Sequence, residues 1–161
     1  MSGALRRAGR GRLPDGPTVA WTVAEGTRGR RWRWSLVDEG GLVSVALAEL
    51  DDRGLFARLE LTTRAGLLTF HPEPDGASAH GNVTGPDGVR PIAMPWAAGW
   101  GIELKGDPFG SAVLAGREPM LAVGRDLSLR QTADEPSTPP LDLDARGIPT
   151  LPDAREWPLE E

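Results

Sequence analysis

The stretch Arg30–Val37, with the sequence Arg-Arg-Trp-Arg-Trp-Ser-Leu-Val, alternates strictly between two kinds of side chain. Trp32, Trp34 and Leu36 share one parity, and Arg31 and Arg33 share the other. Because successive side chains of a β-strand point to opposite faces, this alternation predicts a strand with indoles on one face and guanidinium groups on the other. One buried Trp hides about 150–250 Å², so the two tryptophans dominate whatever surface they contact.

Short apolar segments recur about every ten residues around this stretch and end in turns rich in Gly, Pro and Asp. Prolines at 91 and 95 predict that one segment is an edge strand or is bulged, because proline cannot donate to a sheet. Outside residues 111–114, which fit either one helical turn or a strand, we find no helical pattern. We expect strands at residues 18–24, 30–37, 42–50, 55–62, 67–71, 77–84, 89–96, 100–104, 120–123 and 127–130. The sequence therefore predicts an all-β protein whose antiparallel meander forms a strongly curved sheet, a β-roll or an incomplete barrel.

The 161 residues fit one domain with distinct ends. Residues 1–17 are rich in Arg and Gly and predict a flexible arm, residues 18–130 form the β domain, and residues 131–161 predict a Pro-rich acidic tail. Residues 1–33 carry eight arginines against two acids, whereas residues 131–161 carry two arginines against eight acids. A basic arm and an acidic tail can neutralise each other within one chain.

The composition of the chain excludes several kinds of functional site. The chain has no cysteine, which excludes disulfides, thiolate metal sites and cysteine nucleophiles. The basic opening is not followed by an apolar segment, so we expect no signal peptide, no membrane insertion and a cytoplasmic protein. We find no nucleotide-binding or hydrolase motif and expect no cofactor.

Two polar clusters are candidates for a catalytic or metal site. His71 and His80 flank Glu73 and Asp75, and a hairpin could bring the imidazoles and carboxylates together, but the prolines and glycine between them favour a solvated turn. Residues 142–147 begin like a calcium loop but lack the glutamate at the twelfth position. A binding or structural role is therefore favoured over an enzyme.

Arginines occur in residues 1–17 and in residues 30–37, and both groups are candidates for binding nucleic acid. Arg6, Arg7, Arg10 and Arg12 could contact phosphates, but the arm has no aromatic residue among them. In residues 30–37 the period of two places arginines and tryptophans on opposite faces, so they cannot line one groove. The pattern argues against nucleic acid as a partner.

The tryptophans are better candidates for a binding face. A curved sheet with aromatic side chains on its concave side can hold a hydrophobic or amphipathic small molecule. The alternative is that these side chains fill the core and that the protein acts through its surface, arm and tail. The candidate ligand-binding residues are Trp32, Trp34, Phe70, Met94, Trp96 and Trp100.

One part of the chain resembles a known family. The features in order are Leu68-Thr69-Phe70, Asp75-Gly76, Gly81-Asn82-Val83, Gly88-Val89-Arg90, Pro95-Trp96 and Gly106-Asp107-Pro108. Their turn spacing and Trp placement resemble bacterial glycolipid-binding proteins of the spiral β-roll type. The resemblance implies a single cytoplasmic-type domain built from a long antiparallel meander. The chain departs from that family at Thr138-Pro139-Pro140 and the acidic tail, where the family has a basic closing strand.

Overall fold

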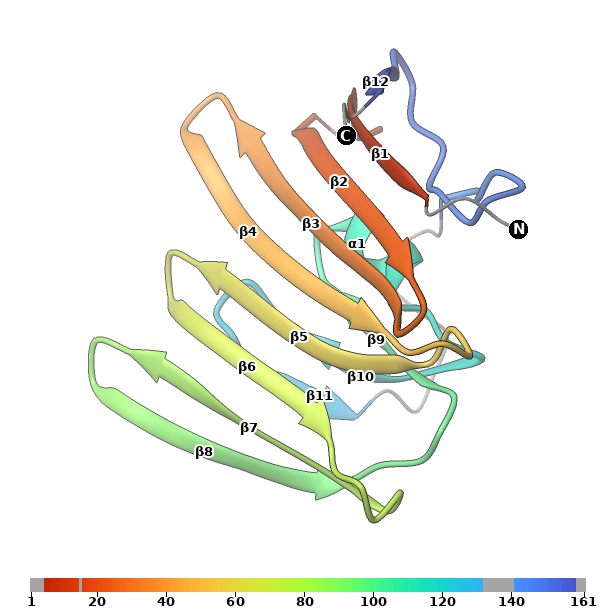
Figure 1. Cartoon of the computed structure of the whole chain (residues 1–161). Coiled ribbons are helices and arrows are strands. Elements are labelled where there is room, and N and C mark those ends of the chain that lie inside the picture. The colour runs from red at the N-terminus through yellow and green to blue at the C-terminus, as the bar shows by residue number, and fades with distance from the viewer. Residues whose placement is uncertain (1–4, 15, 132–140, 159–161) are drawn as a thin grey trace.

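The chain folds into two layers in the computed structural model, which describes residues 5–14, 16–131 and 141–158 (Figure 1). A nine-stranded sheet forms the larger layer, and a short helix with a three-stranded sheet covers one of its faces. We call the covered face the inner face and the opposite one the outer face. The larger sheet comprises β1 (Arg6–Arg12), β2 (Thr18–Gly26), β3 (Gly29–Asp38), β4 (Gly41–Leu50), β5 (Phe56–Thr63), β6 (Gly66–Pro72), β7 (Ser78–Gly85), β8 (Gly88–Pro95) and β12 (Arg155–Pro158). The second layer comprises β9 (Trp100–Leu104), α1 (Pro108–Val113), β10 (Glu118–Val123) and β11 (Leu129–Gln131).

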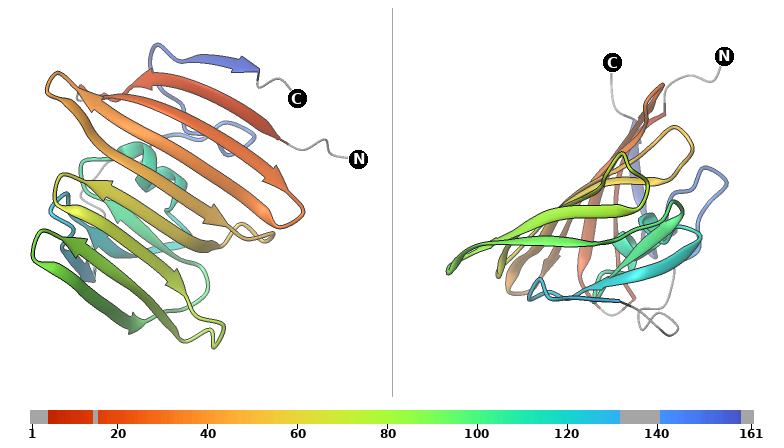
Figure 2. Two further views of the ribbon diagram at one scale, coloured as in Figure 1. Left: turned by 60° about the vertical axis from the view of Figure 1, so that its left-hand side comes forward. Right: turned by 90° about the horizontal axis from the view of Figure 1, so that it is seen from below.

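The larger sheet is the predicted antiparallel meander. Its order is β12-β1-β2-β3-β4-β5-β6-β7-β8, and every neighbouring pair is antiparallel. The sheet twists and stays open among the described residues, with β12 and β8 at its edges (Figure 2). The second layer differs from the prediction, because β9 and β10 run parallel. The helix α1 lies between them in the sequence, and a parallel pair needs such a crossover.

The side chains of β3 alternate between the two faces of the sheet as the sequence predicts. Trp32 and Trp34 are 1% and 2% exposed and point to the inner face, whereas Arg31 and Arg33 lie exposed on the outer face. The register places Trp34 opposite Trp21 of β2, so three indoles gather under adjacent strands. The strand therefore supplies apolar packing on one side and positive charge on the other.

The helix α1 is fixed to the sheet by a buried carboxylate. Asp107 caps its first turn by accepting from the backbone N–H of Gly110 at 2.8 Å. The second carboxylate oxygen accepts from Trp34 Nε1, also at 2.8 Å. Burial raises the pKa of Asp107 above its ordinary value, although the hydrogen bonds from Gly110 and Trp34 act in the opposite direction.

Within the described residues, no helix has the length and apolar character needed to cross a membrane.

The expectation that residues 1–17 form a flexible arm is wrong for residues 6–12, which form β1 and pair with β2 along their whole length. Gly9 and Gly11 face inward, where they leave room for Trp21 and Leu151. A Cβ on Gly9 would lie 2.5 Å from the Trp21 ring. The glycines therefore allow close packing here, although glycine in a basic segment suggested a loop.

The acidic tail also returns to the sheet. Its residues 155–158 form β12, which pairs with β1. Arg7 donates from Nε to a Glu156 carboxylate oxygen at 3.0 Å and contacts Asp144 at 3.4 Å. The predicted neutralisation between the basic N-terminal segment and the acidic tail is thus confirmed at these pairs. Residues 132–140 of the predicted Pro-rich tail lie outside the described residues.

The strand β8 is the edge strand that its prolines predicted. The backbone N–H of Trp96 donates to the Ala77 carbonyl, so the backbone N–H groups of even-numbered residues in this strand point toward β7. Pro91 and Pro95 are at odd-numbered positions, so their backbone nitrogens, which carry no hydrogen, face the free edge of the sheet. This edge therefore offers fewer donors for a further strand.

Candidate functional site

The predicted ligand-binding tryptophans of β3 lie in a filled core. The ring of Phe109 in α1 sits among three indoles, with its centroid 5.8 Å from those of Trp32 and Trp34 and 6.2 Å from that of Trp21. Phe109 is itself fully buried. These separations are typical of packed aromatic pairs, so the helix occupies the space that a ligand would need.

The other predicted residues form a second cluster farther along the inner face. Phe70 and Trp96 pack edge to face at 5.4 Å, and Trp96 contacts half-buried Trp100 at 5.6 Å. Met94 is partly buried against the same core. None of the six predicted residues lines the surface cavity described below. Binding of an amphipathic molecule to this face stays a prediction, and it requires the second layer to move.

The two histidines do meet, as the hairpin prediction suggested. His71 of β6 is paired with His80 of β7, and both imidazoles contact one Glu73 oxygen, at 3.2 and 2.8 Å. Both imidazoles are about half exposed, and Glu73 is half-buried. Among the residues that the structure describes, no group of three or more His, Cys, Asp or Glu side chains is arranged to hold a metal ion.

Arginines dominate the outer face at the opposite end of the sheet. Residues of even parity in β1 and odd parity in β3 point outward, as do alternate residues of β12. The strand β2 contributes only small side chains between them. We call this region the arginine face; it consists of Arg6, Arg10, Arg12, Thr18, Ala20, Thr22, Ala24, Arg31, Arg33, Arg155 and Trp157.

The arginine face is strongly unbalanced in charge. It carries six guanidinium groups and no carboxylate, in a chain whose net charge is −5. Arg31 pairs with Glu49 of the adjoining strand β4 at 2.8 Å. The other five arginines of the face form no ion pair with any described residue. Unpaired guanidinium groups gathered on one surface attract anions and can bind them bidentately.

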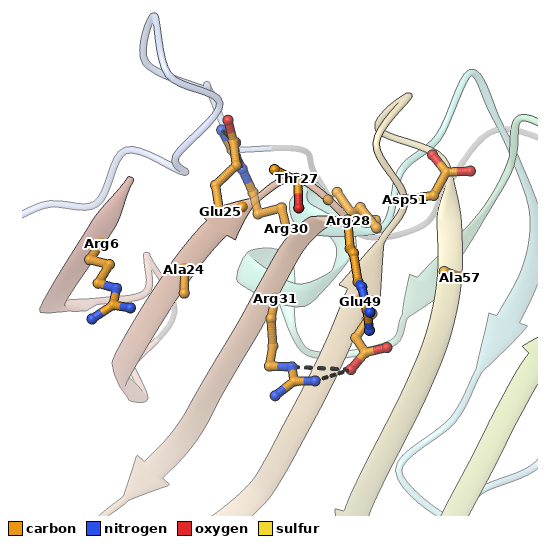
Figure 3. Close-up of a pocket in the computed structure, with 13 residues that line it drawn as sticks. Arg6, Ala24, Glu25, Thr27, Arg28, Arg30, Arg31, Glu49, Asp51 and Ala57 are labelled. Atoms are coloured by element: carbon orange, nitrogen blue, oxygen red, sulfur yellow. Dashed lines mark hydrogen bonds and ion pairs between the residues drawn. The ribbon is translucent and has the colours of Figure 1, made fainter. Parts of the chain in front are cut away.

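A cavity of about 580 Å³ lies at the end of the arginine face, beside the β2–β3 turn (Figure 3). Four arginines line it, and Arg6 and Arg31 flank Ala24 across adjacent strands. Arg30 is held by Glu25 at 2.6 Å and donates to the Arg146 carbonyl at 2.8 Å. Three carboxylates, those of Glu25, Glu49 and Asp51, also line the cavity, so its charge is nearly balanced and the excess of positive charge lies on the open arginine face.

Trp157 gives the arginine face an aromatic surface. Its side chain is 49% exposed, the most exposed of the six tryptophans. The Arg10 guanidinium lies 6.0 Å from the ring centroid, at the limit of a cation–π contact. Cation and aromatic ring therefore share one exposed face here, whereas the Arg30–Trp32 contact of residues 30–37, also at 6.0 Å, involves a buried indole.

Sequence reasoning missed this site because it placed Arg6, Arg10 and Arg12 in a flexible arm. The detectable signal is the alternation of Gly and Arg over residues 9–12, which has the same period of two as β3. Trp157 lies in the segment that the sequence predicts to be an acidic tail. Its place beside Arg10 depends on the pairing of β12 with β1, which joins the two ends of the chain.

Comparison of the chain with protein-family models, with curated proteins and with solved structures finds no match. The resemblance to glycolipid-binding proteins therefore stays a prediction.

Proposed function

We propose that this chain is a non-enzymatic binding module that has a filled core and holds a polyanionic partner on its arginine face. The observation that carries the proposal is the segregation of charge: six arginines and no carboxylate point outward from four adjacent strands. The packing of Phe109 against three indoles favours a surface mode of action over uptake of a ligand into the core.

The geometry suits an extended partner rather than a single small anion. Arginines lie on three strands, β12, β1 and β3, and strands in a sheet are about 4.8 Å apart. The guanidinium groups thus cover a surface rather than converge on one point. Release of counterions from a polyanion would make such binding strongly dependent on salt.

Calorimetric titration with inorganic polyphosphate tests the proposal, because this probe offers charge and no other recognisable group. We expect binding at about 50 mM salt, and we expect the double variant Arg10→Ala/Arg33→Ala to bind roughly 10- to 100-fold more weakly. The matched control is Arg90→Ala, an exposed arginine on the distant edge strand β8. Absence of binding, or equal affinity in all three proteins, would refute the proposal.

A further inference from the structure

The shape of the arginine face distinguishes between kinds of polyanion. The strand β2 presents Thr18, Ala20, Thr22 and Ala24 outward, all of them short and exposed. The outward arginines of β1 and β3 border this row, on both sides at Ala24 and on one side at Thr18, Ala20 and Thr22. The result is a row of small side chains with at least one arginine beside each of them, which we call the β2 trough.

The dimensions of the β2 trough fit one strand of nucleic acid. The strands β1 and β3 beside it are two strand spacings apart, about 9.5 Å between backbones. A duplex, whose major groove alone is about 12 Å wide, is too broad to lie within it. Outward residues along a strand are about 6.8 Å apart, comparable with successive phosphates of an extended single strand. Arg10 and Arg12 are spaced in this way on β1.

The aromatic ring at the edge of the arginine face adds a second, independent observation. Trp157 lies opposite Ala8, beside Arg10, with almost half of its surface open to solvent. Proteins that hold single strands combine a basic groove with aromatic side chains on which bases stack. An acidic protein or a phosphate chain would gain little from an exposed indole in this position.

We propose, on the basis of the function proposed above, that the polyanion is a single-stranded nucleic acid. Its phosphates contact the arginines of β1 and β3 along the β2 trough, and one base stacks on Trp157. Trp32 and Trp34 face away from Arg31 and Arg33 and take no part in this binding. The aromatic residue in this proposal comes instead from the C-terminal strand.

The test compares a fluorescein-labelled oligo(dT) of about 12 nucleotides with polyphosphate of equal charge, a DNA duplex and anionic vesicles of phosphatidylglycerol. We expect the oligonucleotide to bind most tightly. Trp157→Ala should weaken oligonucleotide binding by roughly 5- to 150-fold, the loss of one stacked base, and leave polyphosphate binding unchanged. Trp157→Phe, which keeps a stacking ring, should recover most of the affinity.

Loss of the β12 strand in Trp157→Ala would also weaken binding, so a fluorescence measurement on the unmodified protein provides a second, independent test. Stacking should quench the Trp157 emission when oligo(dT) binds, whereas polyphosphate should not, and Trp157→Phe should bind without that quenching. If polyphosphate, duplex or vesicles bind at least as tightly as the oligonucleotide, or Trp157→Ala has no effect on it, the nucleic-acid inference is wrong and the polyanion proposal stands. If none of the four probes binds, both are wrong.

Discussion

Replacing Phe109 by alanine should destabilise the fold by about 3–5 kcal/mol. The ring is fully buried and contacts Trp21, Trp32 and Trp34 at centroid distances of 5.8–6.2 Å. Truncating a buried Phe to Ala costs about this much, because transfer free energy is lost and a cavity remains. The three aromatic contacts favour the upper half of the range, since each contributes about 0.5–1.5 kcal/mol beyond its area.

Urea denaturation followed by tryptophan emission measures the loss directly. The matched control is Val113→Ala in the same helix, for which we expect only about 1.5 kcal/mol from two methyl groups. A loss below about 1 kcal/mol for Phe109→Ala would refute the view that α1 fills the inner face. The wild-type protein should also show no saturable emission change with an amphiphile such as octyl glucoside. A saturable change would favour ligand uptake by the tryptophan face instead.

Three further predictions follow from single contacts. The Asn side chain of Asp107→Asn cannot accept hydrogen bonds from both Trp34 and Gly110, so this variant should be about 1–3 kcal/mol less stable than the wild type. Because the pKa of Asp107 is raised in the folded protein, the wild type loses stability as pH rises above 3.8, and the stability difference between the two proteins in urea titrations should narrow toward pH 7. A difference that widens toward pH 7 would contradict a raised pKa for Asp107. Gly9→Ala should cost about 1–3 kcal/mol by overpacking, whereas Gly26→Ala, with no atom within 4 Å of the new Cβ, should not, and equal melting temperatures would disprove the close packing of β1. Pro91→Thr restores an edge donor and should increase self-association in sedimentation experiments; a strictly monomeric variant at high concentration would show that this proline does not protect the edge.

The sequence predicted the interior of the meander well because local signals determine it. Alternation in β3 located both faces of the strand, and turns with glycine separated the hairpins from β2 to β8. The pattern of residues 111–114 fits either a helical turn or a strand, and in the structure residues 111–113 belong to α1. Its role could not be predicted, since the hydrogen bond from Trp34 to Asp107 joins residues far apart in the chain.

The arginine face could not be predicted from the sequence because it depends on register between distant segments. The chain ends meet where β12 pairs with β1, and only this pairing puts Trp157 near Arg10. Glycine at positions 9 and 11 suggested a flexible arm, whereas in the fold its small size allows Trp21 and Leu151 to pack closely. Interpreting the arm as a strand would have required knowledge of what it packs against.

The salt dependence of oligonucleotide binding tests the central claim most directly. Four arginines on β1 and β3 have no ion pair among the described residues, namely Arg6, Arg10, Arg12 and Arg33, so full engagement predicts a slope of log K against log salt near −2.8, about −0.7 for each contact. Arg10→Ala/Arg33→Ala should reduce that slope by about 1.4 in magnitude, while Arg90→Ala leaves it unchanged. Equal slopes in the wild type and the double variant would show that the arginine face does not bind the strand.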